Sequence, residues 1–358
     1  MRHGTAGIPA ETAPTRPAPM PAASIAADAR LPRLVIQIPC FNEADTLPAV
    51  LTTLPTAIPG VGEILVLIID DGSGDDTVAV AQAHGVRHIV HHPANRGLAV
   101  AYQSGLDAAL RLGADIIVNT DGDNQYPAVQ IPALIAPILN RAADLVIGDR
   151  QTHRIAHFSP LKRFLQRFGS WVVELAAGVP VPDATSGFRA LTREAALRQL
   201  VLTRYSYTLE TIIQATKKGL RVAYVPIEVN EPLRESRLVK STWNYVKRQA
   251  ATILRSYLFY EPLRAFLLLA SPFVAVGVFL LARFLYFYFT AQSGIGRHVQ
   301  SVVIGGTLLT VGFLIAVLGV MAEINATNRT LLEELLYRQR KQEADQAAAT
   351  AHAEQNTP

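Results

Sequence analysis

Two aspartates, Asp121 and Asp123, have the spacing with the clearest chemical potential in this sequence. They directly follow the run at 115–120, which reads as a buried strand. Carboxylates at positions i and i+2 beyond a strand end can converge on one hard divalent cation, and such a cation offsets the charge of a nucleotide diphosphate. A calcium-binding loop is excluded, because its sixth position requires Gly and is Tyr126 here. The spacing predicts a metal site, and an aspartate-rich turn without function is the alternative.

A second acidic group, Asp70 and Asp71, ends another expected strand and is followed by Gly72 and Ser73. Ligands of open parallel sheets bind at the carboxyl ends of the strands. A carboxylate at this position can accept hydrogen bonds from ribose hydroxyls or from an N–H of a base. The same residue types also suit helix caps and turns, so a structural role is the alternative.

Further polar residues stand at the ends of neighbouring elements. Pro39, Asn42 and Glu43 close the first expected strand, and the Asn-Arg-Gly segment at 95–97 opens the third expected helix. Together with the acidic groups they outline a nucleotide pocket. The sequence contains no Gly-x-x-x-x-Gly-Lys-Ser/Thr loop, and no Gly-x-Gly-x-x-Gly follows the first strand. Phosphate groups must therefore be held by other means.

Alternating strands and helices must position these groups. Short apolar runs read as strands buried on both faces, at 34–38, 64–69, 116–119 and 145–148, with one more at 221–225. Amphipathic segments read as helices, at 45–54, 75–84, 98–112, 128–139 and 160–178. The alternation predicts an α/β fold with a doubly wound, mainly parallel sheet and helices on both faces.

The composition places part of the chain in lipid. Of the 358 residues 50% are hydrophobic and 17% are charged, and the mean hydropathy of +0.22 is too high for a wholly soluble domain of this length. The runs 266–289 and 299–321 are each long enough to cross a hydrocarbon core of about 30 Å, which predicts two transmembrane helices in a hairpin. Arg283 lies near the loop end of the first run and can extend to the interface. Two buried helices of a soluble protein are the alternative.

The charges around the hairpin predict its orientation. The segment at 239–260 mixes basic and aromatic residues with a helical period, which is typical of an amphipathic helix on a membrane surface. Positive charges flank both outer ends of the hairpin, whereas its loop carries only Arg297. The positive-inside rule then predicts a multi-pass protein of the cytoplasmic (inner) membrane, with the α/β domain and both termini in the cytoplasm. The net charge of +4 alone does not distinguish nucleic acid, an anionic membrane and phosphorylated substrates as partners.

Five regions are expected along the chain. They are a disordered N-terminal arm at 1–30, the α/β domain at 31–238, a juxtamembrane amphipathic helix at 239–262, the hairpin at 263–325 and a polar cytoplasmic tail at 326–358.

Six short motifs occur in order along the α/β domain. They are Pro39-x-x-Asn42-Glu43, Asp70-Asp71-Gly72-Ser73, Asn95-Arg96-Gly97, Asp121-x-Asp123-x-Gln125, Gly148-x-Arg150 and Asp183-x-Thr185-Ser186-Gly187-Phe188-Arg189. Through them the sequence resembles, over residues 34–245, the inverting family 2 glycosyltransferases of GT-A fold, and within these the polyprenyl-phosphate glycosyltransferases of the dolichol-phosphate mannosyltransferase type. The resemblance implies a metal-dependent hexosyltransferase that transfers a glycosyl group from a nucleotide-diphosphate sugar to a membrane polyprenyl phosphate.

The resemblance also implies roles for individual residues. Nucleotide-sugar binding falls to Pro39, Asn42, Glu43, Asp70, Asp71, Asn95, Gly97, Asp121 and Gly122. The predicted ligands of the metal, Mg²⁺ or Mn²⁺, are Asp121, Asp123 and Gln125. The catalytic set is Asp121, Asp123, Arg150 and Arg189, and the acceptor phosphate falls to Arg150, Arg163, Arg189, Arg234 and Arg237. The expected partners are the sugar donor, the polyprenyl-phosphate acceptor and the membrane, with no nucleic acid and with a homo-oligomer left open.

A phosphate acceptor suits these residues, because it is already an anion at neutral pH and needs no strong general base. Catalysis then reduces largely to alignment and charge compensation. The main alternative is a membrane-anchored glycosyltransferase that acts on a sugar hydroxyl or another lipid acceptor in cell-envelope polysaccharide synthesis. A processive polysaccharide synthase would add a Gln-x-x-Arg-Trp motif, which is absent. A nucleotide-binding scaffold without activity would not need the metal carboxylates. The sugar and the base stay open.

Overall fold

The fold is seen in a computed structural model of the chain. The structure describes residues 30–151, 174, 178, 180–201, 207–230, 258, 261–290 and 299–355. The helix expected at 160–178, apart from Glu174 and Gly178, lies outside these residues. Most of the juxtamembrane segment and residues 1–29 of the expected N-terminal arm also lie outside them.

A seven-stranded sheet forms the centre of the α/β domain, in the order β3-β2-β1-β4-β6-β5-β7. Its strands are β1 Arg33–Cys40, β2 Glu63–Asp70, β3 His88–His91, β4 Ile116–Asn119, β5 Leu145–Asp149, β6 Arg189–Thr192 and β7 Val222–Pro226. β6 runs antiparallel to both β4 and β5, and the other pairs are parallel. The prediction of a mainly parallel, doubly wound sheet is confirmed, and β3 and β6 are strands that the sequence did not reveal.

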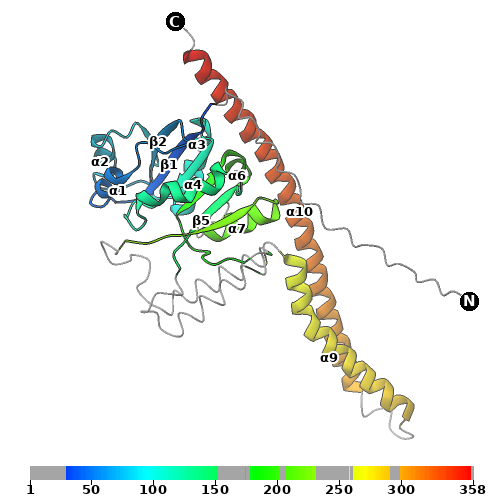
Figure 1. The fold of residues 1–358 in the computed structure, drawn as a ribbon. Coiled ribbons are helices and arrows are strands. Elements are labelled where there is room, and N and C mark those ends of the chain that lie inside the picture. The colour runs from blue at the N-terminus through cyan, green and yellow to red at the C-terminus, as the bar shows by residue number, and fades with distance from the viewer. Residues whose placement is uncertain are drawn as a thin grey trace, which may run out of the picture.

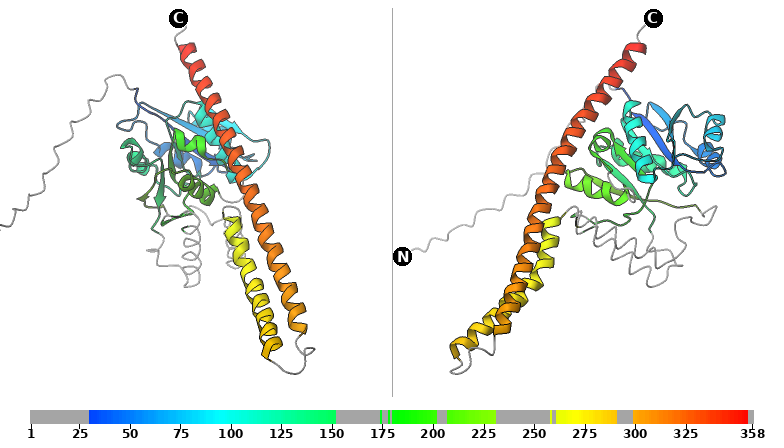
Figure 2. Two further views of the ribbon diagram at one scale, coloured as in Figure 1. Left: turned by 90° about the vertical axis from the view of Figure 1, so that its right-hand side faces the viewer. Right: turned by 180° about the vertical axis from the view of Figure 1, so that it is seen from behind.

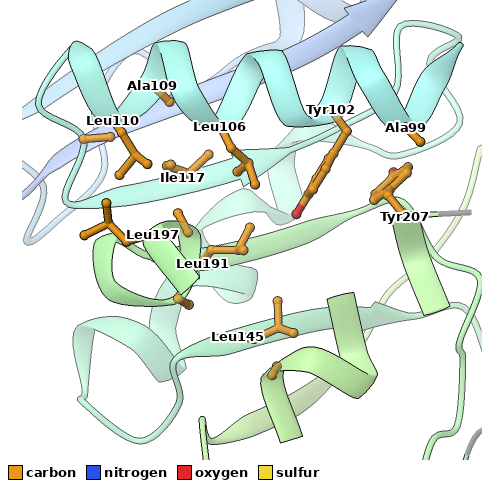
Figure 3. Packing of buried hydrophobic residues seen from close by; sticks show 14 of the residues in the cluster. Ala99, Tyr102, Leu106, Ala109, Leu110, Ile117, Leu145, Leu191, Leu197 and Tyr207 are labelled. Carbon is orange, nitrogen blue, oxygen red and sulfur yellow. The ribbon is translucent and has the colours of Figure 1, made fainter. Parts of the chain in front are cut away.

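Helices cover both faces of this sheet (Figure 1). They are α1 Leu47–Thr53, α2 Thr77–Ala83, α3 Leu98–Arg111, α4 Ile131–Leu139, α6 Arg193–Arg198 and α7 Tyr207–Lys217, with a short 3₁₀ turn, η1, at Ala128–Gln130. One buried cluster joins the sheet to α3, α6 and α7, and the other joins it to α1, α2 and α4. Figure 3 shows part of the first cluster, where Leu106 and Leu110 of α3 face Ile117 of β4 and Leu191 of β6. Burial on both faces explains why the central strands are continuous apolar runs.

Two long apolar helices follow the α/β domain, α9 Pro262–Thr290 and α10 Val299–Gln355, and by length and composition both could cross a membrane. They lie side by side (Figure 2). The helices approach closely at glycines: a Cβ on Gly277 would come within 2.9 Å of the Gly305 carbonyl oxygen, and one on Gly312 within 2.7 Å of the Val274 side chain. Small residues at such contacts let helix backbones pack tightly where lipid offers no hydrophobic driving force.

The helix α10 is much longer than a membrane span requires. Its 57 residues correspond to about 85 Å, against about 30 Å for the hydrocarbon core. Beyond the apolar run it continues without interruption past α3 and α6 of the α/β domain (Figures 1 and 2). The sequence suggests a separate polar tail from residue 326, whereas the structure has one helix running through span and tail.

Candidate active site

Loops that follow β1, β2 and β3 meet at the carboxyl edge of the sheet. The backbone N–H of Asp71 donates to the Cys40 carbonyl at 2.9 Å, and the Asn42 N–H donates to Ser73 Oγ at 2.9 Å. In return the Gly74 N–H donates to Asn42 Oδ1 at 2.8 Å, so the first two loops hold each other. The predicted nucleotide-binding segments are thus brought together at one edge.

Gly72 lets the second loop lie directly against the third. Its φ is +73°, and a Cβ there would come within 2.5 Å of the Ala94 carbonyl carbon. Only glycine combines this backbone conformation with so close an approach.

Asp71 is buried and uses both carboxylate oxygens inside the protein. Oδ1 accepts from the Arg96 N–H at 3.0 Å and contacts Nδ1 of His92 at 2.7 Å, and Oδ2 accepts from the Gly97 N–H at 2.8 Å. Asp71 therefore fixes the turn that opens α3. Its predicted contact with a nucleoside stays a prediction, and the structure gives it a clear positioning role. The sequence assigned no partner to His92.

Asp70 is also buried, and its oxygens likewise have partners. Oδ1 accepts from the Ser73 N–H at 3.1 Å, and Oδ2 lies 2.6 Å from Nδ1 of His91, whose side chain is 61% exposed. The exposed member of this pair is therefore the imidazole ring of His91.

The Asp121 and Asp123 segment packs against the loop after β1. Thr46 Oγ1 lies 2.8 Å from the Gly122 carbonyl oxygen and 2.7 Å from a Glu43 carboxylate oxygen. A Cβ on Gly122 would come within 3.1 Å of Cys40 Sγ and 3.4 Å of Glu43 Cγ. Glu43 and Gly122 are therefore neighbours, and the segment with Asp121 and Asp123 lies beside the loop that follows β1.

The electrostatics of this segment favour a bound cation. Burial, and then the negative charges of Asp123 and Glu43, raise the pKa of Asp121 to about 7, although Arg150 acts against this. A carboxyl group with such a pKa is held near half-protonation at neutral pH, and a divalent cation would stabilise its ionised form in place of the proton. The donor set therefore fits Mg²⁺ or Mn²⁺, which prefer oxygen ligands.

Within the described residues no cluster of three or more His, Cys, Asp or Glu side chains surrounds a metal position. Two carboxylates would then supply part of the coordination of the cation, and other oxygens would supply the rest. Mg²⁺ is commonly held in this way, by one or two carboxylates together with substrate phosphates. Gln125, the third predicted ligand, donates its backbone N–H to Asp123 Oδ1 at 3.1 Å. A role of its side chain as a ligand stays a prediction.

Arg150 follows β5 and is held by Asp183. Its guanidinium makes two parallel bonds to the Asp183 carboxylate, at 2.7 and 2.9 Å, and a third to Thr185 Oγ1 at 2.6 Å. Burial opposes ionisation of Asp183, but Arg150 outweighs this and lowers the pKa of that carboxyl. The fork fixes the guanidinium, and its charge counteracts the raised pKa of Asp121.

The antiparallel strand β6 brings the residues before it to the end of β4. Asn119, the last residue of β4, donates to the Gly187 carbonyl at 2.8 Å and pairs in register with Arg189. A Cβ on Gly187 would lie 2.9 and 3.0 Å from the two Asp121 carboxylate oxygens and 3.0 Å from Tyr207 Oη. Asn119 is not among the site residues predicted from the sequence, although a polar residue that ends a buried strand is a usable signal.

Arg189 is fully buried, and its predicted contact with the acceptor phosphate stays a prediction. Its Nε donates to the Ser186 carbonyl at 2.8 Å, and its other nitrogens donate to Thr211 Oγ1 at 2.5 Å and to the Ala184 carbonyl at 3.3 Å. The guanidinium therefore ties the segment before β6 to α7. We take its role to be support of the Gly187 region.

We expect Arg189→Lys to weaken the fold and to show no selective effect on the acceptor. A single amine cannot replace the forked donors, and a buried acceptor left without a partner costs about 1–3 kcal/mol. Chemical denaturation should show this loss, and Arg221→Lys, at an exposed pair with Asp144, should leave the midpoint nearly unchanged. A rise in the acceptor KM at unchanged stability would instead support direct binding of the acceptor phosphate by Arg189.

The remaining predicted acceptor residues, Arg163, Arg234 and Arg237, lie outside the described residues. Pro39 precedes Cys40, the last residue of β1, and Asn95 lies in the turn before Gly97 against Gly72. The structure thus brings those predicted nucleotide and metal residues that it describes to one edge of the sheet.

Comparison with known proteins identifies the family. The model of Glycosyl transferase family 2 matches residues 35–198. An undecaprenyl-phosphate mannosyltransferase of Micrococcus luteus is 30% identical over 218 residues, which span 58% of this chain and 87% of that protein. The chain belongs to glycosyl transferase family 2. This glycosyltransferase is also 28% identical over 211 residues to a polyprenol monophosphomannose synthase of Mycolicibacterium smegmatis, covering 56% of the chain and 78% of that synthase.

Among solved structures, the glycosyltransferase is similar to glucosyl-3-phosphoglycerate synthase from Mycobacterium tuberculosis in complex with uridine diphosphate. The TM-score is 0.50 at 24% sequence identity, over 63% of this chain and 80% of that one. The likeness concerns the fold, and it confirms the expected GT-A architecture. The expected enzyme class, a glycosyltransferase, is confirmed by the family.

Proposed function

We propose that this glycosyltransferase transfers a glycosyl group, with inversion, from a nucleotide-diphosphate sugar to a membrane polyprenyl phosphate. The observation that carries the proposal is the pair Asp121 and Asp123 at the carboxyl edge of the sheet, in a chain that continues into two apolar helices. The two polyprenyl-phosphate relatives support the choice of acceptor.

The donor would lie across the loops that follow β1 to β4. Asn42, Asn95 and the Asp70 and Asp71 segment are proposed to bind its nucleoside part, with Asp71 acting by fixing the turn at Arg96 and Gly97. The proposed metal site of Asp121 and Asp123 is next to this pocket. A bound Mg²⁺ or Mn²⁺ would supply charge compensation for the departing diphosphate.

The protein's own contribution is alignment. Arg150, oriented by Asp183, is proposed to face a phosphate group, and Gly187 leaves room beside the Asp121 carboxylate. The lipid phosphate attacks the anomeric carbon as an anion, the bond from that carbon to the diphosphate breaks, and no proton has to be removed from the nucleophile. Holding the two reactants in line is then the main requirement.

The membrane placement follows from the two apolar helices. We propose that α9 and α10 span the cytoplasmic membrane, with the α/β domain and both termini in the cytoplasm, because Arg264, Arg329 and Arg338 stand at the outer ends of the hairpin. The polyprenyl chain would stay in the bilayer, with its phosphate at the interface.

We expect cysteine labelling to show this orientation. A cysteine at Gly294 should react with an impermeant maleimide added outside intact cells, and one at the exposed Gln339 should react only after the membrane is opened. The native Cys40 is 2% exposed and should give little background. The opposite labelling pattern would overturn the orientation.

A transfer assay with two lipids tests the proposed acceptor. Membranes containing the enzyme are given a panel of labelled UDP-sugars and GDP-sugars with either polyprenyl phosphate or polyprenol. We expect label to enter the lipid phase with the phosphate, to require a divalent cation and to be absent with the alcohol. Label appearing in a glycolipid or polysaccharide, and not in the lipid phosphate, would support the hydroxyl-acceptor alternative.

A further inference from the structure

The end of α7 is joined to both apolar helices. Lys217 pairs with Glu261, directly before α9, at 2.9 Å, and the next residue, Lys218, pairs with Glu333 of α10 at 3.0 Å. Glu333 also pairs with Arg329 at 3.3 Å. One helix end of the α/β domain therefore contacts both arms of the hairpin.

Further along α10, one face of the helix packs on α6. Tyr337 donates its hydroxyl to a Glu194 carboxylate oxygen at 3.1 Å, and the Arg198 guanidinium lies 5.0 Å from the centre of the Tyr337 ring. Ala344 is 2% exposed and belongs to the buried cluster that contains α3 and α6. Glu333, Tyr337 and Ala344 lie on one side of the helix, because their spacings of about four and seven residues match whole turns.

Arg340 is the polar centre of this contact. Its Nη1 donates to the Gln199 carbonyl at 2.6 Å and to the Leu197 carbonyl at 3.2 Å, and its Nη2 pairs with Asp107 of α3. Its side chain is only 14% exposed. Carbonyls at the end of a helix lack partners within the helix, so a guanidinium that caps α6 and reaches α3 joins three helices.

The position of this contact along α10 sets the distance between the docked residues and the end of the apolar run. At a rise of about 1.5 Å per residue, Glu333 lies about 18 Å and Ala344 about 35 Å beyond Met321, where the apolar run ends. The helix is continuous over this distance. A docked helix that continues into the membrane sets both the height and the orientation of the domain that it carries.

We propose that residues 333–345 of α10 form a docking helix that holds the catalytic domain at a fixed height beside the membrane hairpin, with Arg340 as its positioning residue. The proposal rests on the proposed function, because a fixed height matters when the acceptor phosphate is confined to the membrane surface. The docking helix touches neither donor nor acceptor. It acts by keeping the sheet edge with Asp121 and Asp123 within reach of the lipid.

The test compares Arg340→Ala with Arg338→Ala in vesicles of phosphatidylethanolamine and phosphatidylglycerol. Arg338 is the matched control, since its side chain is 70% exposed and its ion pair among the described residues is with Glu334 of the same helix. Each enzyme is assayed with polyprenyl phosphate in the bilayer and with a short-chain prenyl phosphate in solution, and donor affinity is measured by calorimetry. Carbodiimide coupling of Lys218 to Glu333, read by mass spectrometry, reports docking without any acceptor.

We expect Arg340→Ala to lower transfer to the bilayer lipid by about tenfold to a hundredfold, the effect of a misplaced reactant. Donor affinity and transfer to the soluble acceptor should stay within about twofold of the wild type, and the Lys218 to Glu333 coupling should fall. Arg340→Lys, which keeps the charge beside Asp107, should restore part of the rate. Arg338→Ala should match the wild type.

Two results would overturn the docking proposal. One is an Arg340→Ala enzyme that keeps both the coupling and the bilayer rate, and the other is an equal loss of rate with both acceptors. A wild-type enzyme that forms no product with either prenyl phosphate would instead contradict the proposed function, and the coupling would still decide whether the helix is docked.

Discussion

Asp123→Asn should abolish transfer while leaving the protein folded. The change removes one of the two carboxylates proposed to hold the metal, and charge stabilisation by such an ion is worth several kcal/mol in the transition state. A loss of about 4 kcal/mol lowers the rate by about a thousandfold. Steady-state transfer to polyprenyl phosphate measures this loss, and chelation of divalent cations should reproduce it in the wild type.

Folding and specificity are checked separately for this variant. Asp123 is one of the charges that raise the pKa of Asp121, so its removal relieves a repulsion and should not lower the melting temperature. Asp76→Asn is the matched control, because Asp76 is an exposed residue at the start of α2 whose side chain makes no cap bond. Turnover of Asp123→Asn at the wild-type rate would remove the metal site from this position.

Gly187→Ala should cost about a hundredfold in turnover, although it adds only a methyl group. The new Cβ would lie 2.9 Å from one Asp121 carboxylate oxygen and 3.0 Å from the Tyr207 hydroxyl, distances at which one of these groups must move. A displacement of about 1 Å of a catalytic group is enough for such a loss. Transfer kinetics should show this loss, and titration with Mn²⁺ should show weaker binding of the metal.

Gly74→Ala provides the comparison for this prediction. Gly74 lies in the loop after β2 at the same edge of the sheet, and among the described residues no atom lies within 4 Å of a Cβ placed on it. Its backbone N–H, which donates to Asn42, is kept in the variant. Equal activity of the two alanine variants would contradict the placement of Gly187 against Asp121.

Local patterns made much of the site predictable. Asp121 and Asp123 follow a buried strand at a spacing that suits one cation, and Asn42 and Asp70 each stand where a parallel strand ends. These inferences need only the direction of the chain and the order of elements. The structure accordingly places them at one edge of the sheet.

Long-range pairing made the rest unpredictable. β6 begins with the charged Arg189 and has only four residues, so no apolar run reveals it, yet its antiparallel register brings Gly187 beside Asp121. The burial of Arg189 follows from that pairing, and the motif alone does not reveal it. β3 is hidden for a similar reason, since its four residues begin and end with histidine.

The docking helix could not be predicted from the sequence for a different reason. Its contact face combines Glu333, Tyr337, Arg340 and Ala344, and the mixture of charges with one aromatic and one small residue resembles a solvated surface. Hydrophobic periodicity detects apolar stripes, and it does not detect a face that packs through ion pairs and carbonyl caps. The segment therefore read as a polar tail.

The linkage in the lipid product distinguishes the proposed transfer to a phosphate from its alternatives. Purified enzyme in vesicles is supplied with an α-linked nucleotide-diphosphate sugar and polyprenyl phosphate, and the product is examined by ¹H and ³¹P NMR. Inverting transfer to the phosphate should give coupling between the anomeric proton and a single phosphorus, with the sugar now in the β configuration. A retained α configuration, or a sugar attached to an alcohol oxygen with no phosphorus coupling, would contradict it.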